Sequence, residues 1–266
     1  MRATWCTDVH LNFLRPHVLR AFYDAVKAEQ PDVVLLTGDI GESFSVAGFV
    51  EEIAEAAHCP VYFVLGNHDY YRSSIGLVRE RVRRETRRAV WLPGAEPVRL
   101  NERIVLIGVD GWGDARCGNL ESEVMLSDWR QIEDFRQART RELLIETLQR
   151  LGANEAHSLS ATLARVPPAE QLLVLTHVPP FPEACWYDGK MSDPEWLPWF
   201  TCVATGEVLR RYAGEHPGTR VTVLCGHTHG KGVFEAAPNL EVRTGGWAPG
   251  IEGYGNPIVQ ATLTLE

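Results

Sequence analysis

The chain has 266 residues, which is enough for one large domain or two small ones. Its hydrophobic content of 45% and charged content of 23% are typical of a globular protein. The net charge of −9 argues against a general nucleic-acid or anionic-membrane binder, although a local basic groove stays open, and no apolar run reaches the roughly 18 residues that span a bilayer.

The six cysteines are scattered along the chain without a C-x-x-C pair. The sequence therefore predicts neither a zinc knuckle nor a disulfide framework. Residues 1–6 lack the long apolar region of a secretory signal peptide. We expect a reduced, cytoplasmic protein.

The first ninety residues predict strands that alternate with helices. Apolar runs predict the strands and helical spacing of apolar residues predicts the helices, in the order 2–7, 16–29, 32–37, 43–57, 61–65 and 72–88. This alternation at short intervals indicates a parallel sheet with crossover helices. The helix at 72–88 is rich in arginine, and a solvated face offset by Glu80 and Glu85 is favoured over a phosphate-steering patch.

The remainder of the chain predicts further helices and strands around two irregular segments. The expected elements are a hairpin at 98–100 and 104–109, helices at 127–151, 159–166 and 206–215, and strands at 172–175, 221–224, 232–235, 240–243 and 258–265. Residues 178–200 are expected to be a loop rich in proline and aromatic residues. With no repeat and no linker, the sequence predicts one domain over 1–266, with helical and loop insertions around 110–170 and 178–200.

Five of the predicted strands end in side chains that bind metals or move protons. They are Asp8 with His10, Asp39, Asn67 with His68, His177, and His227 with His229. In open α/β sheets the ligand crevice lies at the carboxyl ends of the strands, so these side chains can meet at one site. The two-residue spacing within Asp8/His10 and within His227/His229 puts both members of each pair on one side of an extended segment.

Each of these residues also has a structural interpretation. An aspartate after a strand is often a helix N-cap, and a histidine in an apolar setting is more often hydrogen-bonded structure than a ligand. Five coincident strand ends favour the site. The other histidines have no partner at such a spacing and keep the structural interpretation; they are His17, His58, His157 and His216.

The ligand types indicate the kind of ion. Histidine, carboxylate and amide oxygen, without cysteine, suit divalent ions such as manganese, iron or zinc. Four histidines, two aspartates and one asparagine exceed the ligands of a single tetrahedral ion. This number favours two ions that share a bridging carboxylate, an arrangement that clamps both the attacking and the leaving oxygen in phosphoryl displacement.

The same residues form short motifs in a fixed order. The motifs are D-x-H at Asp8 and His10, G-D-x-x-E from Gly38 to Glu42, G-N-H-D from Gly66 to Asp69, the lone His177 after a strand, and G-H-x-H from Gly226 to His229. The set resembles the calcineurin-like metallophosphoesterase superfamily over residues 8–229. The resemblance implies an α/β fold, a four-layer α/β/β/α sandwich of two mixed β-sheets flanked by helices.

The resemblance also implies a role for each matching residue. One metal ion would be held by Asp8, His10, Asp39 and His229, and a second by Asp39, Asn67, His177 and His227, with Asp39 as the bridge. His68 would protonate the leaving oxygen, and Asp69 would orient His68. Glu42 stands where the family more often has aspartate, a position usually outside the direct metal ligands. The tyrosine-valine-aspartate-arginine continuation of the Ser/Thr protein phosphatases is absent, which disfavours a phosphoprotein substrate.

The expected function is metal-dependent hydrolysis of a small-molecule phosphomonoester or phosphodiester. A metal can lower the pKa of bound water from 15.7 to about 7, and the bridging hydroxide would attack phosphorus while His68 protonates the departing alkoxide. A nuclease of the same superfamily and a non-catalytic metal-binding scaffold are the alternatives. The acidic charge counts against nucleic acid as a partner, and the complete ligand set counts against the scaffold. No membrane partner is expected, and the oligomeric state stays open.

Two segments are predicted to form the rim of the site. They are 110–130, with Asp110, Trp112, Asp114 and Arg116, and 179–200, with Phe181, Trp186, Tyr187, Trp196 and Trp199. Aromatic side chains beside a phosphate site can stack a nucleobase, pack the loop onto the domain or form a dimer contact, and packing is favoured. The basic candidates for a non-transferred phosphate are Arg116 and Lys190.

Overall fold

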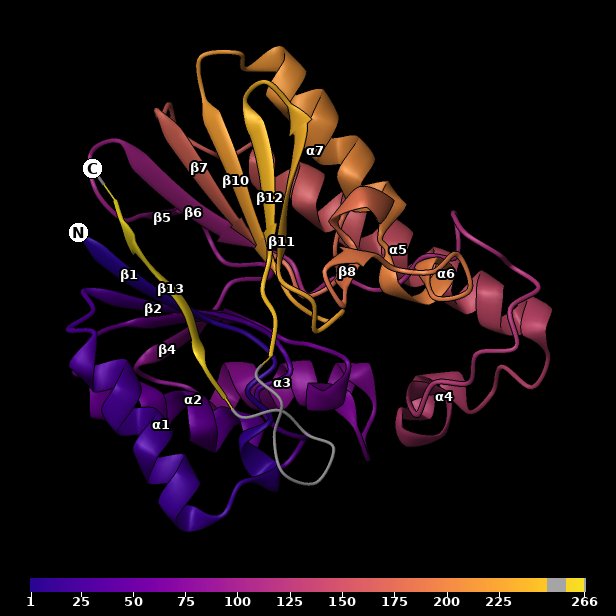
Figure 1. Ribbon diagram of the computed structural model, residues 1–266, viewed down its shortest axis with the longest axis horizontal. Coiled ribbons are helices and arrows are strands. Elements are labelled where there is room, and N and C mark those ends of the chain that lie inside the picture. Colours follow the sequence, from indigo (N-terminus) through magenta and orange to yellow (C-terminus); the bar gives the residue numbers. More distant parts are fainter. Residues whose placement is uncertain (248–256, 266) are drawn as a thin grey trace.

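The computed structural model describes residues 1–247 and 257–265. Its first large sheet has the strand order β13-β1-β2-β3-β4 (Figure 1). The bounds are Arg2–Cys6 for β1, Val33–Thr37 for β2, Val61–Val64 for β3, Ala89–Trp91 for β4 and Val259–Thr264 for β13. Strands β1 to β4 are parallel, and β13 pairs antiparallel with β1 at the edge of the sheet.

The second large sheet has the order β11-β12-β10-β7-β6-β5. Its strands span Val98–Arg99 (β5), Ile104–Gly108 (β6), Gln171–Leu175 (β7), Arg220–Cys225 (β10), Gly232–Ala237 (β11) and Leu240–Thr244 (β12). The four central strands are parallel, and β5 and β11 add antiparallel edges. Both sheets are therefore mixed, as the sequence predicts.

Helices cover the outer faces of the two sheets, which gives four layers (Figure 1). One layer holds α1 (Pro16–Ala28), α2 (Val46–Ala57) and α3 (Ile75–Glu85), and the opposite layer holds α5 (Arg141–Leu163) and α7 (Val203–Glu215). Three apolar clusters fill the spaces between successive layers. The one between the sheets includes Trp5 and Leu35 from one sheet and Leu173 from the other. The predicted α/β/β/α sandwich is confirmed.

Several predicted elements in the middle of the chain are wrong. The predicted helix 127–151 is broken into α4 (Asp128–Gln131) and a 3-10 turn (Glu133–Phe135), and only then does α5 begin. Tertiary hydrogen bonds cause the break, because Gln131 accepts from the Arg72 amide and the Glu133 amide donates to Ser73. The side chain of Thr140 caps α5, which continues to Leu163 and so includes most of the separate helix predicted at 159–166.

Two other segments also differ from the prediction. The helix predicted at 72–88 is present as α3 (Ile75–Glu85), but it is followed by strand β4, which was not predicted and whose Trp91 pairs with Phe63 of β3. The predicted loop 178–200 contains the hairpin β8 (Trp186–Tyr187) and β9 (Lys190–Met191), followed by the short helix α6 (Leu197–Phe200). Asp188 and Gly189 both have positive φ, the geometry of a tight type I′ hairpin turn. Within the described ranges, no helix is long and apolar enough to cross a membrane.

Candidate metal centre

The seven predicted metal ligands lie just beyond the carboxyl ends of strands from both sheets. Asp8, His10, Asp39 and Asn67 follow β1, β2 and β3, while His177, His227 and His229 follow β7 and β10. The site therefore lies where the strand ends of the two facing sheets meet, and each sheet supplies part of it.

Glycines allow the loops that carry these residues to approach one another closely. A Cβ atom on Gly66 would lie 2.2 Å from Asp39 Oδ1, and one on Gly226 would lie 2.2 Å from Asp8 Oδ2. Gly38 has φ +88°, and a Cβ there would lie 2.6 Å from a ring nitrogen of His177. The glycine in each of these motifs is thus explained by steric contact with a predicted ligand.

Most of the predicted ligands sit in left-handed backbone conformation. The φ angles are 51° for Asp8, 42° for His10, 52° for Asp39, 71° for His227 and 60° for His229. Such conformations cost on the order of 1–3 kcal/mol for each non-glycine residue, and they persist only where the surrounding structure enforces them. The strand ends are therefore strained in the way that is typical of functional sites.

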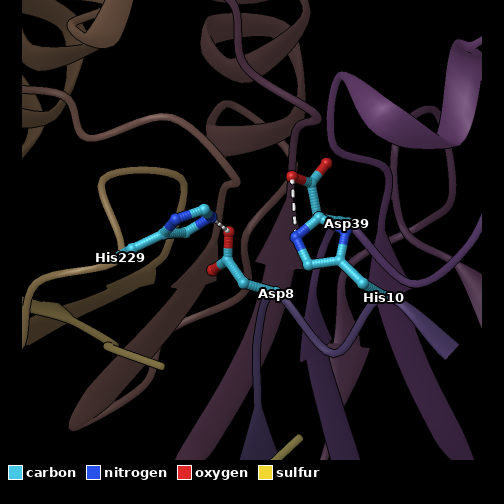
Figure 2. Close-up of side chains that lie close together, drawn as sticks. All are labelled: Asp8, His10, Asp39 and His229. Carbon is cyan, nitrogen blue, oxygen red and sulfur yellow. Dashed lines mark ion pairs between the residues drawn. The ribbon is translucent and has the colours of Figure 1, made fainter. Parts of the chain in front are cut away.

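Four of the ligands form one compact cluster (Figure 2). Ligand atoms of Asp8, His10, Asp39 and His229 all lie within 4.8 Å of one another. His229 Nε2 is 3.4 Å from Asp8 Oδ1, and His10 Nε2 is 3.7 Å from Asp39 Oδ2. Two carboxylates and two imidazoles at these distances could hold one divalent ion.

The remaining ligands gather on the other side of Asp39. His177 Nε2 lies 3.4 Å from Asp39 Oδ1, 3.1 Å from Asn67 Oδ1 and 3.2 Å from His227 Nδ1. Asp39 therefore contacts both groups of ligands, the position that a bridging carboxylate requires.

The hydrogen bonds around His177 and Asn67 test whether a cation fits between them. His177 Nδ1 is 2.8 Å from the carbonyl oxygen of Thr37, so Nδ1 carries the proton and the lone pair of Nε2 faces the site. Asn67 donates through Nδ2 to Asp128 Oδ1 at 2.9 Å, which turns its Oδ1 toward the same point. Two acceptors thus face each other, an arrangement that a metal ion between them would satisfy.

The pKa values of these groups fit the same interpretation. Burial lowers the pKa of His10 to about 4 and also lowers the pKa values of His177 and His227, so these three imidazoles are neutral at pH 7. Burial, together with the nearby charge of Asp8, raises the pKa of Asp39 well above its ordinary value. Neutral imidazoles beside two buried carboxyl groups lack the positive charge that divalent ions would supply.

The predicted proton donor, His68, lies beside the ligands. Its Nε2 is 4.0 Å from Asp39 Oδ2, its backbone amide donates to Asp39 Oδ1 at 3.0 Å, and its side chain keeps 21% exposure. The ring stacks on Tyr71 with a centroid distance of 4.3 Å. His68 is thus held at the site while staying accessible to a substrate.

Asp69 was predicted to orient the His68 ring, but its side chain forms hydrogen bonds with backbone amides instead. Its Oδ1 accepts from the backbone amides of Ile40 and Gly41 at 2.9 and 2.7 Å, and its Oδ2 accepts from Gly66 at 2.8 Å. These bonds join the loop after β2 to the loop after β3, and none of them goes to the His68 ring. The contacts of Asp69 support a role in positioning Asp39 and Asn67.

Two further carboxylates, Asp128 and Asp110, form hydrogen bonds with the candidate ligands or with the loops that carry them. The sequence alone did not predict either role. Asp128 accepts from Asn67 and from the Tyr71 hydroxyl at 2.7 Å. Asp110 is fully buried, accepts from the Leu65 amide at 2.8 Å, and through its carbonyl accepts from the His177 amide at 2.8 Å. Asp110 thereby connects the loops of Asn67 and His177. The one signal in the sequence was its place just after a buried strand.

Asp110 belongs to a network that also includes Arg79 and Glu155. Arg79 donates to Asp110 Oδ2 at 2.9 Å, to Glu155 Oε1 at 2.7 Å and to the Tyr70 hydroxyl at 3.1 Å. The carboxylates are 0% and 5% exposed, whereas the Arg79 side chain is 26% exposed. This arginine was predicted to lie on a solvated helix face, but it neutralises two buried carboxylates.

The predicted rim is only partly at the surface. Trp112, Asp114, Phe181 and Trp199 are buried, so this part of the two segments packs onto the domain. Tyr187 and Trp196 are 57% and 40% exposed. The basic candidates also differ, since Arg116 pairs with Asp114 and Glu207 at 3.7 Å, while Lys190 lines a cavity that reaches His227 and His229.

A family model described as calcineurin-like phosphoesterase matches residues 1–231. The chain belongs to this family. The chain is similar to phosphopantetheinyl hydrolase from Mycobacterium tuberculosis, at 14% identity and a TM-score of 0.61, with 92% of this chain and 90% of that chain covered. It is also similar to a dimetal phosphatase from Danio rerio, at 18% identity and a TM-score of 0.53, covering 92% and 87%. At these identities the likeness concerns the fold. A comparison with curated protein sequences finds no match.

Proposed function

We propose that the protein is a dinuclear metal-dependent hydrolase of small-molecule phosphate esters. Membership of the calcineurin-like phosphoesterase family supports the reaction class. The observation that carries the dinuclear site is the position of Asp39, whose two carboxylate oxygens face different histidines, Oδ2 toward His10 and Oδ1 toward His177. Manganese, iron or zinc suits a set of imidazole, carboxylate and amide ligands.

The chain's own residues fix the geometry of this site. Asp8, His10, Asp39 and His229 would hold one ion, and Asp39, Asn67, His177 and His227 the other. The bond to Thr37 sets the tautomer of His177, and the bond to Asp128 sets the orientation of Asn67. When bound, the two ions would activate a water molecule and stabilise the charge that develops on the phosphoryl oxygens.

His68 is the proposed general acid. Burial lowers the pKa of His68 well below its ordinary value, and the negative charge of a bound phosphate ester would raise this pKa. The stacking contact with Tyr71 holds the ring beside Asp39, so that Nε2 can donate its proton to the departing oxygen.

Metal analysis of single variants tests the ligand assignment. We expect Asn67→Ala to lower metal occupancy and His68→Ala to leave it unchanged, because only Asn67 contributes a ligand atom. His157→Ala, which removes an exposed imidazole on α5, is the matched control. Full occupancy in Asn67→Ala would contradict the assignment.

A panel of phosphate esters tests the reaction. His68→Ala should reduce hydrolysis of alkyl esters more than that of activated aryl esters, because an aryl oxide leaves without a proton. Equal losses on both types would refute the acid role, and a metal-loaded protein inactive on every monoester and diester would refute the proposed function.

The reducing, cytoplasmic location is also a proposal. It is supported by the cysteines, all six of which are free thiols.

A further inference from the structure

A cavity of about 510 Å³ opens directly beside the predicted metal ligands His227 and His229. This volume lies in the range of sites that enclose a drug-sized molecule, and a phosphate group alone would fill a small part of it. The cavity therefore has room for the organic group of a phosphate ester.

Aromatic residues line the cavity, namely Tyr187, Trp196, Phe200 and Trp247, and two of them contact the predicted ligand histidines. Trp247 stacks on the His229 ring with a centroid distance of 4.1 Å and an interplanar angle of 25°. Phe200 packs edge-on against His227 at 4.4 Å, and Trp196 packs on Phe200 at 5.2 Å. Aromatic surface thus continues from the ligand histidines to the mouth of the cavity.

The β8–β9 hairpin lines one side of the cavity and packs against the segment that follows His229. A Cβ atom on Gly232 would lie 2.3 Å from the Trp186 ring, so β8 packs tightly against the segment that follows His229. On the same hairpin, Tyr187 and Met191 are 57% and 47% exposed and line the cavity. Large apolar side chains left open to solvent on an anchored hairpin indicate a binding surface.

The charges in the wall disfavour a second phosphate group. Among the described residues that line the cavity, the one Lys or Arg is Lys190, and Asp188 and Asp193 line the same cavity. A further phosphate would meet more negative than positive charge there. The same polar side chains can form hydrogen bonds with the edge of an uncharged heteroaromatic ring.

We propose that this cavity binds a planar aromatic ring with a polar edge, of the nucleobase type, carried by the organic group of the phosphate ester. The proposal rests on the proposed phosphoesterase function and specifies its substrate class. Trp196 and Tyr187 provide the exposed stacking faces, and the ligand histidines at the inner end place the ester phosphate at the metal centre.

Calorimetric binding of adenosine and of ribose to the purified protein tests the ring contact without hydrolysis. Adenosine should bind and ribose should not. Because stacking contributes about 1–3 kcal/mol per base, Trp196→Ala and Tyr187→Ala should each weaken adenosine binding roughly 5- to 150-fold. Leu77→Ala on α3 removes a side chain of matched exposure, 56%, and should have no effect.

A second measurement compares adenosine 5′-monophosphate with ribose 5-phosphate, which share the same primary leaving oxygen. The preference in kcat/KM for the adenosine ester over the ribose ester should fall in Trp196→Ala, whereas Leu77→Ala should leave this preference unchanged. Adenosine binding no tighter than ribose binding, or unchanged in both variants, would overturn the proposal. If adenosine binding depends on Trp196 while the manganese-loaded protein hydrolyses neither of these esters nor p-nitrophenyl phosphate, the ring site stands and the proposed hydrolase fails.

Discussion

Replacing Arg79 by methionine should destabilise the protein and the network that supports the candidate metal centre. The guanidinium donates three hydrogen bonds, and two of them go to the buried carboxylates of Asp110 and Glu155. Methionine retains much of the apolar stem, so the change removes mainly the charge and the donors.

The expected loss of unfolding free energy is about 3–5 kcal/mol. Removing one partner of a buried ion pair costs this much because the other charge stays buried without compensation. Asp110 keeps donors from Leu65, Tyr70 and Trp91, at 2.8, 2.7 and 2.9 Å, so most of the loss arises at Glu155. The 26% exposure of the Arg79 side chain favours the lower end of the range.

The loss should depend on pH in a defined direction. Burial raises the pKa of Glu155 already in the intact protein, and without the guanidinium this pKa rises further. The folded state then binds a proton more tightly than the unfolded state, so stability falls as the pH rises. The deficit of the Arg79→Met variant should be largest at neutral pH and should shrink as the pH approaches the ordinary glutamate pKa of about 4.3.

Urea denaturation of three variants provides the assay. The double variant with Arg79→Met and Glu155→Gln should recover at least about 1 kcal/mol relative to Arg79→Met alone. Arg84→Met on the same helix, with a side chain that is 61% exposed, should leave stability nearly unchanged. A loss below about 1 kcal/mol in Arg79→Met, or no recovery in the double variant, would refute the argument.

Three other perturbations test the metal centre. Gly38→Ala should cost about 1–3 kcal/mol and lower metal occupancy, since its Cβ would lie 2.6 Å from the Gly66 nitrogen, whereas Gly48→Ala on α2, with no atom within 4 Å, should be neutral or stabilising. Metal analysis and denaturation would show whether the two variants differ. Asp128→Ala frees the Asn67 amide and should weaken metal affinity about 10- to 100-fold in competition with a chelator; unchanged affinity would rule out the positioning role. With free manganese at 100 times the Kd of the site, bound metal should raise the unfolding free energy by about 2.7 kcal/mol. A chelator should remove this gain, and added manganese should restore it.

The sequence predicts those parts of the fold whose signal is local. Strand β2 is an apolar run that is buried at every position, so its character is evident from Val33–Thr37 alone. Strand β4 has three residues and follows an arginine-rich helix, and it exists because Trp91 pairs with Phe63. The break before α5 depends on bonds to Arg72 and Ser73, which lie about sixty residues earlier in the chain.

The candidate site also has a part that a local sequence signal predicts and a part that depends on tertiary contacts. The gathering of the candidate ligand side chains in one place could be predicted because each follows a strand, and parallel strands bring their carboxyl ends to one edge. The roles of the supporting carboxylates could not be predicted. Asp110 accepts a hydrogen bond from a backbone amide 45 residues away, and Asp128 accepts one from a side chain 61 residues away. Such contacts are set by the packing of helices and loops, which no local pattern in the sequence specifies.

The division of the centre between two sheets has a consequence during synthesis of the protein. The amide of His227 donates to the carboxylate of Asp8 across 219 residues of chain. At about 5–20 residues per second, roughly 10 to 45 s pass between the emergence of these two residues from the ribosome. Until His177, His227 and His229 have been synthesised, a nascent chain carries only part of the proposed ligand set. The choice of ion would therefore be made after β10 has joined its sheet.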